Sequence, residues 1–119
     1  MNHYLILSLA IGLSFFSFGV KLNRDPGSMD TRFAYRTRSS LRNEDTWYEA
    51  NIYAGKVMML IAAFVLPLLI FADIRINRID MLISVFSVTI LASLSLTYLF
   101  TEIHLRKLFF RDGKRRPKF

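Results

Sequence analysis

Three arginines in a polar segment of the chain are the residues best suited to bind another molecule. Arg36, Arg38 and Arg42 lie between the first two apolar stretches. A guanidinium is planar and always charged, and its N–H donors form a fork that fits a carboxylate or a phosphate. These residues therefore indicate a surface that holds an anionic group or the carboxyl end of a helix. The alternative is that they pair with nearby acidic residues or with lipid phosphates.

A stripe of three residues follows the arginines at helical spacing. Trp47, Asn51 and Gly55 are four residues apart, so they lie along one face of a helix. An aromatic ring, an amide and a gap on one face suggest a docking groove for another backbone or helix. The alternative is internal, with Trp47 anchored at the membrane interface and Asn51 bonded to the first or third apolar stretch. The predicted partner-binding residues are Tyr35, Arg36, Thr37, Arg38, Arg42, Trp47, Asn51 and Gly55.

The residue patterns of catalytic and metal sites are missing from the sequence. There is no cysteine, and the five glycines form no phosphate-binding loop. The two histidines, His3 and His104, lie in distant parts of the chain, and neither has the i, i+4 partner typical of zinc-binding helices. The apolar stretches also contain no carboxylate for a proton relay. We therefore expect neither an enzyme nor a metal or other cofactor, and an enzyme or transporter is the least favoured interpretation.

Three apolar stretches must position these residues. Segments 1–20, 57–72 and 81–101 contain no Asp, Glu, Lys or Arg. A helix that crosses the bilayer needs about 20 mostly apolar residues. The second stretch reaches this length only if it starts near residue 52, where the long stem of Lys56 can carry its charge to the interface. The sequence predicts an all-α membrane protein, a single domain of residues 1–119 with transmembrane helices at about 3–21, 52–72 and 81–101.

The second helix is expected to be longer than the membrane is thick. Asn43 is a good N-cap because its side chain can accept a hydrogen bond from a backbone N–H of the first turn. Glu44 and Asp45 follow it, where the positive end of the helix dipole favours negative charge. We therefore expect the helix to begin near Asn43 and to carry its first turns in the interface.

The distribution of basic residues predicts the orientation. Loop 1, between the first two helices, and the tail 102–119 hold six and seven basic residues, and the opposite connection holds Arg75 and Arg78. The positive-inside rule then places the N-terminus outside and both the arginine-rich loop and the C-terminus in the cytoplasm. Because topology accounts for the basic surplus, we do not expect nucleic acid as a partner. The residues predicted to contact anionic lipid headgroups are Lys114, Arg115, Arg116 and Lys118.

The segment 35–55 resembles the signature of the SdpI family of small bacterial membrane proteins, in its short single-module form. The residues that match are Tyr35, Arg36, Thr37, Ser40, Leu41, Asn43, Glu44, Trp47, Ala50, Asn51 and Gly55. Ala34 departs from the pattern, since the family usually has glycine there. The resemblance implies a multi-pass protein of the bacterial cytoplasmic (inner) membrane without enzymatic activity.

The resemblance also implies a binding function. The founding member protects its producer from a secreted killing peptide and holds a transcriptional repressor at the membrane, and it has additional N-terminal spans. We therefore expect immunity to, or sensing of, a secreted toxic peptide through the surface formed by loop 1 and the second helix. The alternative is a small accessory subunit packed against a larger inner-membrane complex. The expected partners are membrane lipids and a protein or peptide.

Overall fold

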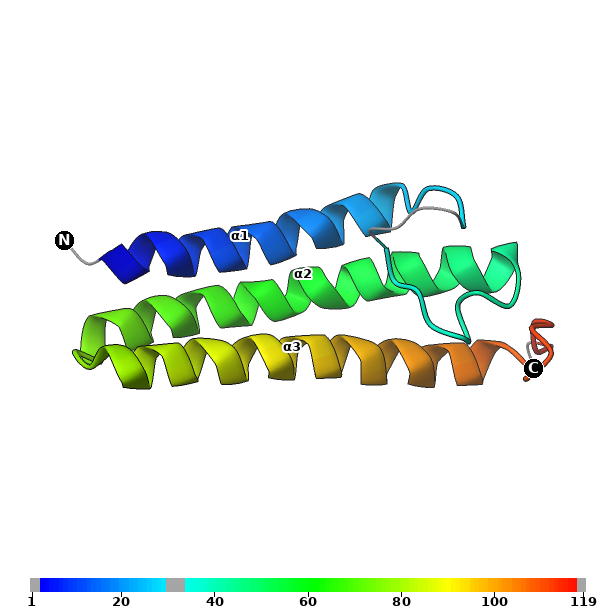
Figure 1. The fold of residues 1–119 in the computed structure, drawn as a ribbon. Helices are drawn as coiled ribbons and strands as arrows, with labels where there is room; N and C mark the ends of the chain where they lie inside the picture. The colour runs from blue at the N-terminus through cyan, green and yellow to red at the C-terminus, as the bar shows by residue number, and fades with distance from the viewer. Residues whose placement is uncertain (1–2, 30–33, 118–119) are drawn as a thin grey trace.

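Three helices lie side by side in the computed structural model, which describes residues 3–29 and 34–117 (Figure 1). They are α1 (His3–Arg24), α2 (Glu44–Arg75) and α3 (Ile79–Leu108), and neighbouring helices run antiparallel. α2 is the central helix because it packs against both others, whereas no Cα atoms of α1 and α3 lie within 8 Å of each other in the described parts of the chain. The molecule measures 53 × 23 × 22 Å.

The predicted fold class is confirmed, since all three helices are long and apolar enough to cross a membrane. Each predicted span falls inside one helix, and the helices continue beyond it. α2 has 32 residues and α3 has 30, or roughly 45 Å of helix each at ~1.5 Å per residue. These helices are longer than a hydrocarbon core of about 30 Å. Their ends therefore project toward the headgroups and carry polar side chains there.

α2 begins at Glu44, directly after the predicted N-cap residue Asn43. The Asn43 side chain accepts a hydrogen bond from the Thr46 backbone N–H at 2.8 Å, and the Thr46 hydroxyl accepts one from the Asn43 N–H at 3.0 Å. This reciprocal capping box satisfies two donors that the first helical turn leaves without a partner. Glu44 and Asp45 occupy the first turn, as expected from the helix dipole.

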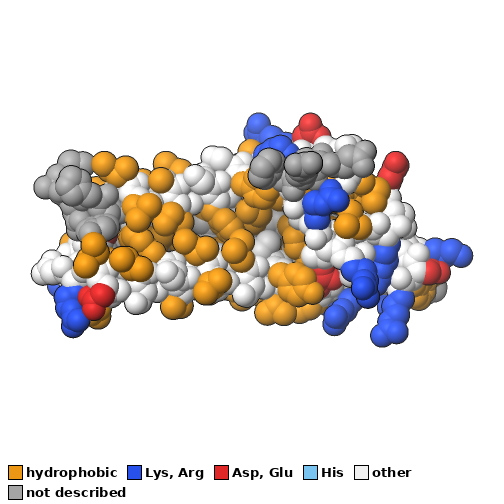
Figure 2. Space-filling model, viewed as in Figure 1, with side chains coloured by type: hydrophobic (Ala, Val, Ile, Leu, Met, Phe, Trp, Pro, Cys, Tyr) orange, Lys and Arg blue, Asp and Glu red, His pale blue; other side chains and the backbone are white. Residues whose placement is uncertain are grey.

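Large apolar side chains cover the outside of the bundle as well as filling its interior. Phe64 is 79% exposed, and Ile74, Val88 and Leu91 are each exposed by 65% or more. Figure 2 shows apolar side chains along most of the length and most of the visible Lys and Arg side chains toward one end. Such a surface would be costly in water, but lipid tails are as apolar as the side chains themselves. The bilayer therefore acts as the solvent for the middle of the molecule.

α1 and α2 approach each other closely at two glycines. A Cβ atom added to Gly55 would meet the carbonyl oxygen of Gly19 and would lie 2.6 Å from the backbone nitrogen of Asn23. The Asn23 side chain also donates to the Ile52 carbonyl at 3.0 Å. Backbone packs on backbone here, which the absence of a side chain permits. The close approach of Gly19 and Gly55 therefore fixes the position along α2 at which α1 ends and loop 1 begins.

Loop 1 and the segment after α3 meet at the same end of the bundle, as three spans require (Figure 1). The Asn43 side chain donates to the Gly113 carbonyl at 2.8 Å, and Arg115 pairs with Asp45 at 2.7 Å. The two basic segments of the sequence are therefore neighbours in space. That this end faces the cytoplasm stays a prediction from the charge distribution.

Candidate functional site at the polar end

The polar end of the molecule comprises loop residues 34–43, the first turns of α2, the last turns of α3 and the turn 109–117. Its centre is the Asn51 side chain, which is fully buried. The Asn51 carbonyl oxygen accepts from the Tyr35 backbone N–H at 2.8 Å, and its amide donates to the Tyr35 carbonyl at 3.1 Å. The same amide donates to the Trp47 carbonyl at 3.0 Å. One side chain on α2 thus binds both polar groups of a loop residue, as a neighbouring β-strand would.

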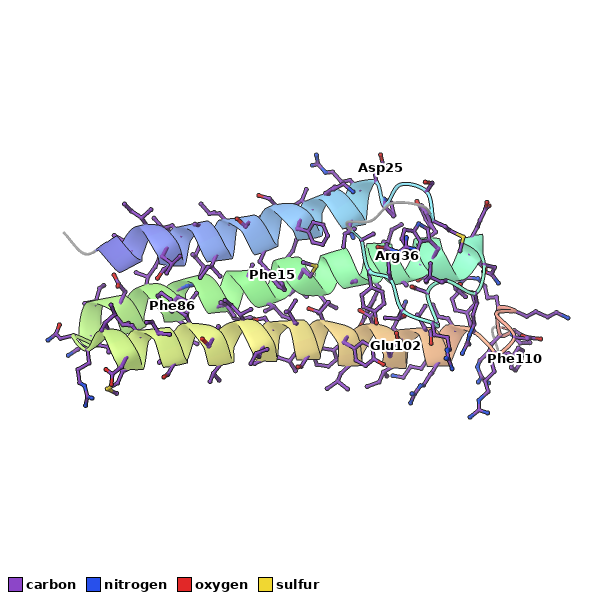
Figure 3. The ribbon with its side chains drawn as sticks, viewed as in Figure 1. Phe15, Asp25, Arg36, Phe86, Glu102 and Phe110 are labelled. Atoms are coloured by element: carbon purple, nitrogen blue, oxygen red, sulfur yellow. The ribbon has the colours of Figure 1, made fainter. Side chains whose placement is uncertain are left out.

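Glu102 on α3 holds the same loop from the other side (Figure 3). One of its carboxylate oxygens accepts from the Tyr35 hydroxyl and from the Thr37 hydroxyl, both at 2.7 Å. Glu102 is only 7% exposed, so these bonds replace the water that the carboxylate loses. Burial of the Tyr35 phenol, together with its bond to Glu102, raises the pKa of Tyr35 above its ordinary value. The phenol therefore remains a protonated donor.

A tight turn closes the loop between Thr37 and Leu41. The Ser40 hydroxyl accepts from the Thr37 backbone N–H at 2.8 Å and donates to the Thr37 carbonyl at 2.9 Å. The Leu41 N–H donates to the same carbonyl at 3.0 Å. Short hydroxyl side chains often replace backbone partners in this way. The turn is consequently rigid, and it carries Arg38 on its exposed side.

Trp47 fixes the earlier part of loop 1. Its side chain is only 3% exposed, and the indole N–H donates to the Gly27 carbonyl at 3.0 Å. The Arg36 guanidinium lies 5.8 Å from the Trp47 ring centroid and donates to the Met29 carbonyl at 2.6 Å. A cation over an indole face is a favourable electrostatic contact. Arg36 therefore packs against the loop while the residue as a whole stays exposed.

These contacts bear on both interpretations of the stripe on α2. The groove suggested by Trp47, Asn51 and Gly55 is filled by the chain itself, with loop 1 on the first two residues and Gly19 on the third. The internal interpretation is therefore supported, with one correction, since Asn51 bonds to the loop rather than to α1 or α3. A partner would meet the exposed arginines that these residues position.

The exposed members of the predicted partner-binding set are Arg36, Arg38 and Arg42. Tyr35 and Thr37 are half-buried and donate to Glu102. Arg42 donates to the Phe110 carbonyl at 3.2 Å, so it reaches across to the turn after α3. For all eight residues, contact with a partner stays a prediction.

A second network joins α2 to α3 and to the segment after it. The His104 ring stacks on Tyr53 with centroids 3.8 Å apart and lies within hydrogen-bond distance of the Glu49 carboxylate at 2.9 Å. Arg115 lies 3.5 Å from Glu49 and 2.7 Å from Asp45. The hydrogen bond to Asp45 raises the pKa of Arg115. Asp45 and Glu49 of α2 are thus paired with Arg115 of the basic segment.

The basic segment is a folded turn over its described part, and not a free tail. The Phe110 N–H donates to the Lys114 carbonyl at 2.8 Å, and the Arg116 N–H donates to the Leu108 carbonyl at 2.6 Å. Gly113 has a φ of +89°, which only glycine adopts without strain. Phe109 is 3% exposed and fastens the turn to the bundle. Residues 109–117 of the predicted basic tail therefore form an ordered turn against the bundle.

The predicted headgroup contacts change accordingly. Arg115 is turned toward Asp45 and lies 4.7 Å from the Phe109 ring centroid. Lys114 and Arg116 are exposed, and Lys118 lies outside the described residues. Contact of these residues with lipid stays a prediction.

Sequence reasoning missed Glu102 as the acceptor for the loop, and it considered His104 only as a possible metal ligand. Glu102 follows the last apolar stretch directly, where a carboxylate would otherwise face the interface. A signal was present, because a carboxylate that directly follows an apolar stretch needs a donor nearby. Within residues 3–29 and 34–117 there is no group of three His, Cys, Asp or Glu side chains that could hold a metal ion.

Three membrane-length helices with a hydrogen-bonded polar end define a small multi-pass membrane protein. The chain belongs to the SdpI family, because the model of the SdpI/YfhL protein family matches residues 28–99, more than half of its 119 residues. No curated protein and no solved structure matches the chain. The matched region contains the loop, all of α2 and most of α3, so it includes the Asn51 contacts with Tyr35.

Proposed function

We propose that this protein is a binding protein of the bacterial inner membrane that gives immunity to, or senses, a secreted toxic peptide. Membership of the SdpI family supports this class of function. The proposed contact surface is the exposed face of loop 1, formed by Arg36, Arg38 and Arg42. The proposal includes no catalytic step.

The observation that carries the proposal is the fixed conformation of this loop. Asn51 binds the Tyr35 backbone, Glu102 binds the Tyr35 and Thr37 hydroxyls, and each partner belongs to a different helix. A surface ordered before binding does not lose conformational freedom when the partner arrives, which favours affinity. Placing charged side chains on such a rigid loop is typical of a recognition surface.

The chemistry of the surface suggests the chemistry of the partner. Guanidinium groups favour carboxylates, so the bound segment would carry acidic side chains or a free C-terminal carboxylate. Binding would then weaken as salt concentration rises, because exposed charge pairs are screened over about 10 Å at 0.1 M salt.

A pull-down from the native membrane in mild detergent tests the proposal. The tagged chain is compared with R36Q/R38Q and with R75Q/R78Q, a matched variant that removes the same charge around the opposite connection. We expect a small peptide or protein that is captured by the natural chain and by R75Q/R78Q but is lost from R36Q/R38Q. Equal capture by both variants, with both inserted in the membrane, would contradict the proposal.

The alternative function, an accessory subunit of a larger complex, has its own structural support. An apolar groove of about 330 Å³ lies between α1 and α3, whose described Cα atoms are all more than 8 Å apart, and over α2; it is lined among others by Phe15, Met58 and Ile90. A helix of a partner subunit could fill such a groove. The same pull-down separates the two functions, since a large membrane assembly in fixed ratio supports the subunit function.

A further inference from the structure

A second cleft lies at the polar end, on the side of α3 and the turn that follows it. Its volume is about 490 Å³, within the range of roughly 300–1,000 Å³ typical of small-molecule sites. Four arginines line it, Arg42 from loop 1, Arg106 from α3, and Arg111 and Arg116 from the turn. The buried side chains of Leu105 and Phe109 give it an apolar wall. The arginines converge from three separate parts of the chain.

The cleft combines four positive charges with no acidic lining residue. Among the nearby acids, Asp45 and Glu49 pair with Arg115, Glu102 accepts from the loop hydroxyls, and Asp112 accepts from the Lys114 backbone N–H. Like charges brought together repel each other, and an anion between them relieves the repulsion. The distribution of charge therefore favours an anionic ligand.

Two of the arginines are held in place by backbone carbonyls. Arg42 uses one terminal nitrogen to donate to the Phe110 carbonyl at 3.2 Å. Arg116 uses its Nε to donate to the carbonyls of Arg106 and Phe109, at 3.0 Å and 3.2 Å, and its guanidinium lies 4.6 Å from the Phe110 ring centroid. These contacts fix the orientation of each guanidinium through part of its donor set. Its other N–H groups are available for a ligand.

We propose that this cleft binds a phosphate group carried by an organic molecule. Phosphate offers several acceptor oxygens in a tetrahedral arrangement, so it can receive donors from more than one guanidinium at once. The volume exceeds what a bare ion needs, and the wall formed by Leu105 and Phe109 suits an attached carbon skeleton. The ligand is thus a phosphate ester.

The position of the cleft is compatible with two sources of that ester. Arg106 lies just beyond the last apolar stretch, which ends at residue 101, so the cleft is at headgroup depth. An anionic phospholipid can present its phosphate there from the bilayer, and a soluble phosphate ester can enter from the aqueous side. The proposal goes beyond the proposed function, because Arg106 and Arg111 lie outside loop 1.

The test uses the full chain purified in a maltoside detergent, which contains no phosphate. Binding of phosphatidylglycerol is counted by native mass spectrometry, and binding of glycerol 3-phosphate is measured by calorimetry. The variant R106Q/R111Q is compared with R24Q/R38Q, which removes the same charge from the end of α1 and from loop 1, both outside the cleft. We expect R106Q/R111Q to weaken binding by about tenfold or more, since hydrogen bonds to charged groups are lost. We expect R24Q/R38Q to change it by less than about threefold.

The binding measurements have four informative outcomes. Retention of phosphatidylglycerol that is lost in R106Q/R111Q, without measurable binding of glycerol 3-phosphate, identifies a lipid headgroup site. Binding of glycerol 3-phosphate that is lost in the same variant identifies a site for soluble esters. Equal losses in the two variants, or no binding of either ligand by the natural chain, would overturn the proposal. Circular dichroism and the fluorescence of Trp47 check that R106Q/R111Q keeps the fold.

Discussion

The two ends of the bundle are held together by different means. At the polar end, buried side chains bond to backbone and hydroxyl groups of distant segments, as Asn51 does with Tyr35 and Glu102 with Thr37. At the opposite end, residues 76–78 connect α2 to α3, and the ion pair there is the exposed contact between Arg78 and Asp80 at 2.8 Å. A short connection needs few contacts because the chain itself keeps the helices adjacent. A loop of about twenty residues must be fixed by specific bonds.

The two ends differ in how specifically their contacts define one conformation of the bundle. Apolar helices gain little by leaving lipid for each other, so the middle of the bundle relies on close packing such as that of Gly19 with Gly55. Buried hydrogen bonds are directional, and each leaves an unsatisfied group when its partner is displaced. The polar end therefore determines one loop conformation, while the middle determines mainly that helices lie together.

We expect stability to be most sensitive to substitution where Gly55 of α2 packs against Gly19 of α1. G55A places a methyl group against the Gly19 carbonyl and the Asn23 backbone nitrogen, neither of which can move without shifting α1. We expect a loss of about 3 kcal/mol of stability, measured by unfolding in denaturing detergent, because overpacking against backbone forces the helices apart.

The matched control for that variant is G12A on α1. Its added methyl group would meet the Leu66 side chain, which can change rotamer. We expect a loss of about 1 kcal/mol or less. Equal losses in the two variants would mean that the crossing has no special role.

The Asn51 amide should rank next. N51L removes the bonds to the Tyr35 N–H and carbonyl and leaves both loop groups without this partner. We expect a loss of about 2 kcal/mol and faster amide hydrogen exchange of Tyr35, because an unsatisfied buried group costs its full desolvation. The control is N77L in the exposed connection, for which we expect no change in the exchange of Tyr35. Slow exchange of Tyr35 in N51L would show that the loop is held by other contacts.

A substitution of Glu102 by glutamine, which has nearly the same shape, should reduce stability less than N51L does. E102Q retains an acceptor oxygen for the Tyr35 and Thr37 hydroxyls but loses the charge that strengthens those bonds. We expect a loss of about 1 kcal/mol, again in denaturing detergent, with the helices intact by circular dichroism. E44Q, which changes an exposed acid at the same end, should leave stability within about 0.5 kcal/mol. A loss in E44Q as large as in E102Q would indicate a general effect of charge.

The exposed ion pairs should contribute least. R78A removes the contact with Asp80, where both side chains are more than 60% exposed, and we expect a change of about 0.5 kcal/mol or less. R115A removes contacts with Asp45, Glu49 and the Phe109 ring, so we expect a loss of about 1 kcal/mol that shrinks in high salt. A larger loss of stability in R78A than in R115A would contradict the expectation that the ion pairs of the polar end contribute more.

Much of the fold follows from local features of the sequence. The three apolar stretches predict the helices because lipid selects for hydrophobicity over about 20 residues, which a short window of sequence reveals. The start of α2 was equally readable, since the capping box lies within residues 43–46. The signature in residues 35–55 identified the SdpI family.

The site could be predicted only in part. The sequence singled out Tyr35, Trp47 and Asn51 as special residues, and their spacing placed two of them on one helix face. It suggested a groove open to a partner, whereas loop 1 folds back and fills that face. It also missed Glu102, which is 67 residues away from Tyr35 in the chain. A polar residue in a sequence indicates that a partner is required, but not which of many distant groups supplies it.

The sequence by itself thus determined the number of helices, the start of α2 and the gathering of basic residues at one end, since each depends on composition or on neighbours within a turn. Only the tertiary structure decided that Asn51 and Glu102 hold the loop, that Arg115 pairs with Asp45 and Glu49, and that four arginines line a cleft. Hydrogen bonds and ion pairs act over a few ångströms, so they depend on how the helices bring distant segments together.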